Sequence, residues 1–238
     1  MCTSAVILAG GRGERLGHDK AMLELGGVPL LERQRSLLTQ LSDDLIVVQR
    51  ADQHLVAGNV RLVPDLSPYT GVLAGLAAGL SAARYPWAIV VACDMPFLSL
   101  SLLRYMLALR EGYDIVVPRL EVGFEPLHAL YRQCCLPPLL QALAAGQKRV
   151  VSFYGSLRVR HVLPEEIAPY DPRLRSFFNI NTPEDLAQER QWIAGELSKR
   201  PLGQLLNDWQ GTLPRYPREP HALAQALWIH PLSEVVRG

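Results

Sequence analysis

The stretch that most constrains the fold is residues 87–93 (WAIVVAC), which are apolar without alternation. A strand with one face in water alternates apolar and polar residues, whereas a strand that helices cover on both faces is apolar throughout. Asp94 and Pro96 follow directly and end the run. The stretch therefore predicts a central strand of a sheet that is covered by helices on both sides.

Strand-like and helix-like patterns alternate along the chain to about residue 120. Further strands are predicted at residues 5–9, 44–48, 61–64 and 114–118. Helices are predicted with Pro29 as the first helical residue, from Val72, where glycines permit close packing on a sheet, and with Ser99 or Ser101 as the N-cap. Such alternation is typical of a mostly parallel sheet with right-handed crossovers. Residues 128–132 are predicted to pair antiparallel, because no helix separates them cleanly from their neighbours. The predicted fold class is α/β, a mostly parallel central sheet with an antiparallel portion.

The last third of the chain divides into two parts. A helix is predicted over residues 137–145, and Thr182 followed by Pro183 and two acidic residues predicts another that runs to about residue 199. Prolines then punctuate residues 200–238. We expect one α/β domain over residues 1–199 and a Pro-rich extension with short helices over residues 200–238, to which the sequence assigns no role.

A glycine-rich loop follows the first predicted strand. Gly10, Gly11 and Gly13 allow backbone N–H groups to approach a ligand, and Arg12, Arg15 and Lys20 supply positive charge nearby. No Gly-Lys-Ser/Thr follows, so the loop is no P-loop, and the glycine spacing does not fit a dinucleotide fingerprint. The pattern predicts a phosphate-binding loop, with an ordinary strand-to-helix turn as the alternative.

Four polar or glycine positions fall where predicted strands end: Gly10, Gln49, Asp65 and Asp94. Ligands of open α/β sheets bind at the carboxyl ends of the strands, so these positions are candidate ligand contacts. An aspartate at the place of Asp94 can hold Mg²⁺ that bridges phosphate oxygens. A loop-capping role is the alternative for Asp94 and, for Asp65 taken alone, the more usual one.

Three further polar positions have competing interpretations. Asn179 and Asn181 are expected to flank one residue of a short strand and so to share a face. One of them is a candidate for binding a metal or a substrate oxygen, although helix capping competes for Asn181. His128 is expected to be a structural histidine with satisfied ring nitrogens rather than a catalyst. Glu165 and Glu166 are expected to be solvated.

Composition narrows the functional class further. A formal net charge of +1 gives no electrostatic case for binding nucleic acid or an anionic membrane. The four cysteines form no spaced framework, which predicts reduced thiols in a cytosolic protein. The N-terminus has no signal-peptide pattern, and the most apolar helical stretch, residues 71–83, is too short to span a bilayer. We therefore expect a cytoplasmic protein.

Six segments together resemble a known family. They are residues 8–11 (LAGG), 15–20 (RLGHDK), 71–75 (GVLAG), 93–96 (CDMP), 126–132 (PLHALYR) and 177–186 (FFNINTPEDL). In this order they are similar to the molybdenum cofactor guanylyltransferases over about residues 4–195. The opening is shared by many nucleotidyltransferases, whereas the last two segments are much more specific. The resemblance implies a three-layer nucleotidyltransferase (Rossmann-like) fold.

The resemblance also implies a reaction. The terminal phosphate of molybdopterin, with or without molybdenum, would attack the α-phosphorus of GTP and form molybdopterin guanine dinucleotide. Pyrophosphate would be the leaving group and Mg²⁺ the cofactor. The resemblance leaves open whether the protein also associates with molybdoenzymes or other cofactor-biosynthesis proteins. A molybdopterin cytidylyltransferase and a non-catalytic cofactor-delivery module with this fold stay open as alternatives. A sugar-1-phosphate nucleotidyltransferase would usually carry longer sugar-binding segments.

The family's functional residues carry over to matching positions of this chain. The resemblance implies catalytic roles for Arg15, Lys20 and Asp94, and metal binding by Asp94 and Asn181. The implied nucleotide-binding residues are Leu8, Ala9, Gly10, Gly11, Lys20, Gln49, Asp65 and Asp94, and the implied pterin-binding residues are Arg149, Asn179 and Asn181. Two features depart from the family: Gln49 stands where asparagine is usual, and the chain beyond about residue 200 has no counterpart in the shorter members.

Overall fold

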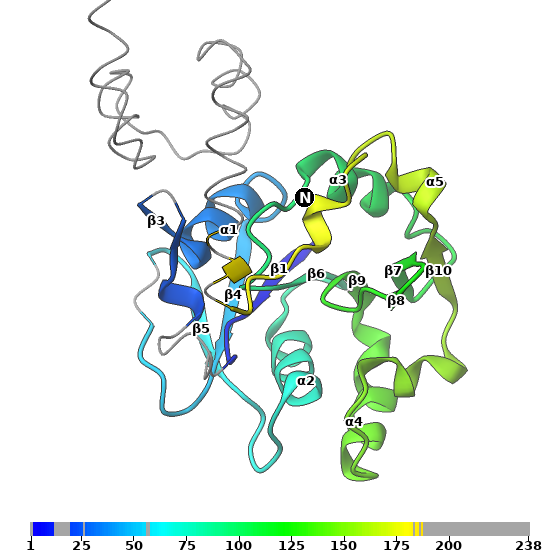
Figure 1. Cartoon of the computed structure of the whole chain (residues 1–238). Coiled ribbons are helices and arrows are strands. Elements are labelled where there is room, and N and C mark those ends of the chain that lie inside the picture. The colour runs from blue at the N-terminus through cyan, green and yellow to red at the C-terminus, as the bar shows by residue number, and fades with distance from the viewer. Residues whose placement is uncertain are drawn as a thin grey trace, which may run out of the picture.

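The computed structural model describes residues 2–11, 20–25, 27–55, 58–182, 184, 185 and 187 (Figure 1). Its main sheet has the strand order β10-β7-β9-β6-β1-β4-β5, and β8 pairs with β7. The strands are β1 (Ser4–Leu8), β4 (Asp44–Gln49), β5 (Arg61–Pro64), β6 (Trp87–Ala92), β7 (Ile115–Leu120), β8 (Gly123–Phe124), β9 (His128–Arg132) and β10 (Val159–Val162). A separate hairpin joins β2 (Glu24–Leu25) to β3 (Val28–Pro29).

The pairing of the strands confirms the predicted fold class. β1 lies between β4 and β6 and is parallel to both, and β4 is parallel to β5. β9 runs antiparallel to both β6 and β7, as predicted for residues 128–132. The described sheet is therefore mostly parallel, with β9 and the short β8 as its antiparallel portion.

Helices cover both faces of the sheet, with α1, α3 and α5 above it and α2 and α4 below it in Figure 1. They are α1 (Leu30–Leu38), α2 (Val72–Ala82), α3 (Leu100–Ala108), α4 (Leu136–Ala144) and α5 (Pro164–Ile167). Within the described ranges, 3₁₀ segments connect the elements at η1 (Lys20–Met22), η2 (Gln133–Cys135), η3 (Val150–Ser156) and η4 (Arg175–Phe177). No helix among the described residues is long and apolar enough to cross a membrane.

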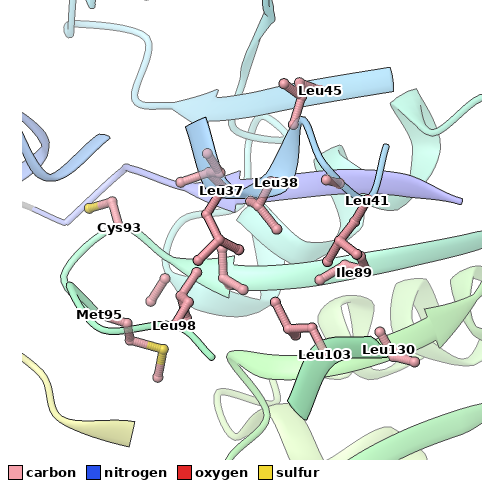
Figure 2. Close-up of a cluster of buried hydrophobic side chains, with 14 of the residues drawn as sticks. Leu37, Leu38, Leu41, Leu45, Ile89, Cys93, Met95, Leu98, Leu103 and Leu130 are labelled. Carbon is pink, nitrogen blue, oxygen red and sulfur yellow. The ribbon is translucent and has the colours of Figure 1, made fainter. Parts of the chain in front are cut away.

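The two-residue period of the strands gives one cluster of core side chains on each face of the sheet, and the described residues form a third, smaller cluster of Leu25, Leu30 and Ile180. Ile7 and Ile89 face α1 and α3, whereas Val6 and Val90 face α2 and α4. Figure 2 shows the first cluster, in which leucines from α1 and α3 meet Ile89 of β6 and Leu130 of β9. This burial on both faces explains why residues 87–93 are apolar throughout.

The small residues of α2 allow it to pack closely on β1 and β4. A Cβ atom added at Gly79 would lie 2.4 Å from Val6 Cγ1, closer than real side-chain contacts allow. The close approach predicted from the glycines of this helix is confirmed. It brings the start of α2 to the edge of the sheet at which β1 and β5 end.

Several local predictions need correction. Pro29 is the last residue of β3 and the N-cap of α1, with ψ of 141°, so it is not the first helical residue. The pair Asn179 and Asn181 flanks Ile180 in an extended segment that forms no strand. The elements β8, β10 and α5 were not predicted. The body of the helix expected after Thr182 and all of residues 200–238 lie outside the described residues.

Candidate active site

A cavity of about 910 Å³ opens at the carboxyl ends of β1, β4, β5 and β6. Each of these strands ends just before residues that line the cavity, as expected for a parallel sheet. Its lining includes Leu8, Gly10, Gly11, Lys20, Arg50, Asp65, Asp94, Asn179, Asn181 and the loop over residues 67–72. Most of the candidate ligand residues that the sequence indicates are therefore brought to one place.

Lys20 connects three segments that are distant in the sequence. Its Nζ donates to Asp94 Oδ2 at 2.8 Å and to Asn181 Oδ1 at 2.6 Å. The side chains of Lys20 and Asp94 are 13% and 17% exposed, so the ion pair is largely shielded from water. One carboxylate oxygen and one amide oxygen thus converge on a single positive charge.

The backbone around Asp94 is fixed by a buried glutamine that sequence reasoning missed. Gln34 Nε2, on α1, donates to the carbonyl oxygens of Ala92 at 2.5 Å and Met95 at 3.0 Å. Gln34 is 2% exposed and occupies the apolar face of its helix between Leu31 and Leu38. A buried glutamine must find polar partners. Its place on an apolar helix face was therefore the feature of the sequence that indicated a structural hydrogen bond.

Asn179 and Asn181 share a face, as predicted, and both line the cavity. Ile180 between them is fully buried, and its backbone N–H donates to the Asp94 carbonyl at 2.9 Å. Capping of the next segment falls to Thr182, whose Oγ1 accepts from Asp185 N at 3.1 Å. Asn181 is therefore not the helix cap, and its side chain is directed to Lys20 instead.

Asp65 presents its carboxylate between two glycines. A Cβ atom at Gly10 would lie 3.4 Å from Asp65 Oδ2, and one at Gly75 would lie 3.2 Å from Oδ1. Burial raises the pKa of Asp65, and the nearby Arg50 opposes that shift. Within the described part of the chain, no hydrogen bond is made to this carboxylate, so it does not cap its loop.

Arg50 is a second residue that sequence reasoning missed. Its Nη1 donates to the carbonyl oxygens of Gly10 at 3.2 Å and Gly11 at 3.3 Å. With those carbonyls directed at Arg50, the glycine loop is held against the end of β4. The residue follows Gln49 at the end of a predicted strand, a position that should have drawn attention to it.

The comparisons with known proteins agree with this architecture. The family model described as MobA-like NTP transferase domain matches residues 5–161. A molybdenum cofactor guanylyltransferase of Desulfosudis oleivorans is 34% identical over 198 residues, which cover 82% of this chain and 98% of the relative. The chain belongs to the molybdenum cofactor guanylyltransferase family. A protein of Pelotomaculum thermopropionicum named as a probable member is 37% identical over 187 residues, 79% of this chain and 91% of the relative.

Solved structures of similar proteins support the three-layer fold of this guanylyltransferase family. The molybdopterin-guanine dinucleotide biosynthesis protein A of Archaeoglobus fulgidus aligns with a TM-score of 0.68 and 27% identity, covering 81% of this chain and 99% of that chain. A 2-C-methyl-D-erythritol 4-phosphate cytidylyltransferase of Thermus thermophilus has a TM-score of 0.61 at 20% identity, over 79% of this chain and 97% of the other. The second likeness concerns the fold alone.

Some residues implied by the guanylyltransferase resemblance lie elsewhere. Arg149 lines a second hollow of about 770 Å³, together with Arg119 and Phe124, rather than the first cavity. Gln49 does not line the cavity, and its Oε1 accepts from the backbone N–H of Leu55 at 3.2 Å. The side chain of Ala9 is fully buried in the core. Arg15 lies outside the described residues.

His128 lies in the core as a structural residue, but neither ring nitrogen has a hydrogen-bond partner among the described residues, so the expectation of satisfied ring nitrogens is wrong. The side chain is fully buried, its ring lies 4.9 Å from that of Phe177, and burial lowers its pKa to about 4. Glu166, by contrast, is not solvated as expected. It accepts hydrogen bonds from Arg160 and from Tyr105 Oη, the latter at 2.8 Å, and Arg160 holds the pKa of Glu166 below its usual range.

Proposed function

We propose that this protein transfers GMP from GTP to molybdopterin, with or without bound molybdenum, and releases pyrophosphate. The observation that carries the proposal is the Lys20 ammonium, which joins Asp94 and Asn181 beside the glycine loop in a member of this family. Transfer of a nucleotidyl group requires positioning and neutralisation of charge more than covalent chemistry from the protein. A cationic loop that faces a carboxylate provides both.

The triphosphate would lie along the glycine loop. We assign the backbone N–H groups at Gly10 and Gly11 to phosphate oxygens, and Lys20 to the neutralisation of their charge, with Arg15 assisting. Leu8 and Asp65 would contact the nucleoside from the cavity wall. Gln49 and Ala9 do not line the cavity, so we propose that they contribute to nucleotide binding only indirectly.

Asp94 and Asn181 are the residues that would hold Mg²⁺. Their two oxygens already converge on one cation, the ammonium of Lys20, and oxygen donors of this kind suit Mg²⁺. A site with only one or two protein ligands is usual for Mg²⁺ that also binds substrate phosphates. The ion would supply charge stabilisation at the phosphates when bound.

The acceptor would approach from the side of Asn179. The first cavity includes Leu127 and the second hollow includes Pro126, so the two openings adjoin at consecutive residues. We propose that the pterin extends from Asn179 and Asn181 toward Arg149 in the second hollow. A terminal phosphate oxygen of molybdopterin then bonds to the α-phosphorus of GTP as the bond to pyrophosphate breaks. The attacking oxygen is already ionised, so no general base is required.

The test is release of pyrophosphate by the purified protein with Mg²⁺ and molybdopterin, with GTP, CTP and ATP compared as donors. We expect GTP to be preferred. Preference for CTP would make the protein a cytidylyltransferase, and nucleotide binding without turnover would support the delivery module instead. Either result overturns the proposal.

The proposed domain division can be tested in the same assay. We propose that residues 1–199 carry the activity and that residues 200–238 serve another purpose, such as association with molybdoenzymes or other cofactor-biosynthesis proteins. Removing residues 200–238 should leave turnover unchanged and alter association. We also propose a cytoplasmic location, which is in keeping with four free cysteines.

A further inference from the structure

The ammonium of Lys20 occupies the two oxygens that the proposed function assigns to Mg²⁺. We propose that Lys20 is an electrostatic latch. Without nucleotide it holds Asp94 and Asn181 and keeps free divalent cations out of the site, and it releases them only when a triphosphate offers it another partner. This inference rests on the proposed metal-binding role of Asp94 and Asn181.

The latch is well formed in the structure. Both contacts of Lys20 Nζ are short, at 2.8 Å to Asp94 Oδ2 and 2.6 Å to Asn181 Oδ1, and the ion pair is largely shielded from water. Hydrogen bonds between charged partners at this distance are among the stronger ones in proteins. A metal ion that uses the same two oxygens would stand close to the ammonium. Two cations at such a distance repel one another, so one must leave.

The lysine also has a route away from these oxygens. A Cβ atom added at Gly11 would lie 3.7 Å from Lys20 Cδ, so the stem of the lysine runs beside the glycine loop. Rotation about its last bonds is enough to turn Nζ from Asp94 toward that loop. A triphosphate bound there would attract the ammonium, which would free the two oxygens as the nucleotide arrives.

A bound triphosphate carries more negative charge than either of the other carboxylates described near Lys20, which are Asp65 beside Gly10 and Asp185 beside Asn181. Oδ2 of Asp185 already accepts from the backbone N–H groups of Asn181 and Thr182, both at 2.8 Å. The triphosphate is therefore the partner that we expect to draw the ammonium from Asp94. Metal and nucleotide should consequently each strengthen the binding of the other.

The test measures binding of Mn²⁺ alone, by its electron paramagnetic resonance signal, without nucleotide or pterin. Lys20→Met keeps the length of the side chain and removes the charge, and we expect it to bind Mn²⁺ about tenfold or more tightly than the wild type. Lys20→Arg is the matched control and should stay near the wild type. The double variant Lys20→Met/Asp94→Asn should lose the gain, which would place the bound ion at Asp94.

Two results would overturn the latch: a dissociation constant for Lys20→Met within twofold of the wild type, or a gain that survives in the double variant. Far-ultraviolet circular dichroism checks that each variant is folded, and Lys20→Gln replaces Lys20→Met under the same criteria if the latter is not. Neither GTP nor pterin is present, so the outcome is independent of the pyrophosphate assay. The Mn²⁺ titration can therefore support the latch even if the pyrophosphate assay shows no guanylyl transfer, and it can exclude the latch even if transfer occurs.

Discussion

Among the described residues, two buried carboxylates, Asp44 and Asp114, and two half-buried ones, Asp94 and Asp65, have opposite surroundings. Asp44 accepts from Ser4 Oγ, Arg84 N and two nitrogens of Arg61, and Asp114 accepts from the backbone and guanidinium of Arg158. In the cavity, Asp94 has Lys20 as its ionic partner, and Asp65 accepts no hydrogen bond from the described residues. The first group is saturated with donors, and the second retains capacity for a ligand.

The pKa values of Asp44, Asp114 and Asp65 follow this division. Donors from Arg158 hold the pKa of Asp114 well below its usual range, and the pKa of Asp44 is also lowered because donors from Ser4, Arg84 and Arg61 outweigh its burial. Burial instead raises the pKa of Asp65. A saturated carboxylate stabilises the fold, whereas an unsaturated one is kept at some cost in stability and suggests function.

The largest effect is expected at Asp94. We expect Asp94→Ala to lose nearly all turnover, on the order of 10³-fold in kcat, because the proposed metal site loses its carboxylate. Steady-state release of pyrophosphate measures this. The unfolding free energy should change little, because the contacts of Gln34 are made to backbone atoms and persist.

The control for that variant is another aspartate of the same cavity. Asp52 pairs with Arg50, and its side chain is 72% exposed. We expect Asp52→Ala to keep kcat within about threefold of the wild type, because an exposed ion pair contributes little. Equal losses in the two variants would mean that cavity carboxylates act only through their summed charge.

Removal of a saturated carboxylate should damage the fold and spare the chemistry. We expect Asp44→Asn to lower the unfolding free energy by about 2–3 kcal/mol, because the donors of Ser4 and Arg61 lose a charged acceptor. The neighbouring Asp43 is exposed and accepts from Tyr85 Oη at 3.1 Å, so Asp43→Asn should cost less than about 0.5 kcal/mol. Urea unfolding at pH 7 compares the two.

Acid should narrow the difference between wild type and Asp44→Asn. The pKa of Asp44 is lower in the folded state than in the unfolded state, so its contribution is present above the ordinary aspartate value of about 3.9. It is lost as the pH falls from there toward the lowered folded value. A difference that grew on acidification would contradict the assigned role.

The sequence predicted what local patterns encode. The continuous apolar run of β6 identified a strand covered on both faces, and Asp94 was a candidate because it follows that strand directly. The contact between Lys20 and Asn181 spans 161 positions, and only the family resemblance associated the two residues. Physical reasoning from one sequence has no means of pairing residues at that separation.

The missed features depend on tertiary partners. Gln34 and Arg50 act through backbone carbonyls of distant segments, and such acceptors carry no sequence signature. The short strand β10, at one end of the sheet, is only partly buried and contains Arg160 and His161, so its pattern resembles a loop. Glu166 was judged solvated because its partners Tyr105 and Arg160 come from other elements.

Two glycines of α2 provide a smaller test of the same contrast. Gly79→Ala forces a Cβ atom to 2.4 Å from the stiff Val6, and we expect a net loss of about 1–2 kcal/mol in unfolding free energy, because overpacking outweighs the helix propensity of alanine. Gly75→Ala meets the Asp65 carboxylate at 3.2 Å instead. It should leave stability within about 0.5 kcal/mol of the wild type and raise the KM for GTP. Thermal unfolding and steady-state kinetics separate the two, and a stability loss at Gly75 equal to that at Gly79 would contradict the assignment.

The smallest effect, and the one of opposite sign, is expected at Asp65. Asp65→Asn removes a charge that burial disfavours, so we expect the unfolding free energy at pH 7 to rise by a few tenths of a kcal/mol, up to about 1 kcal/mol, while affinity for GTP falls. Because the folded pKa is raised, the cost of Asp65 is present above that value and disappears as the pH falls below the ordinary aspartate range. Urea unfolding at pH 7 and near pH 4 should therefore show the advantage of Asp65→Asn shrinking in acid, whereas the deficit of Asp44→Asn should persist near pH 4 and shrink only as the pH falls below about 3.9. A variant that is less stable than the wild type at pH 7 would place Asp65 among the saturated carboxylates and remove the basis for assigning it to the nucleoside.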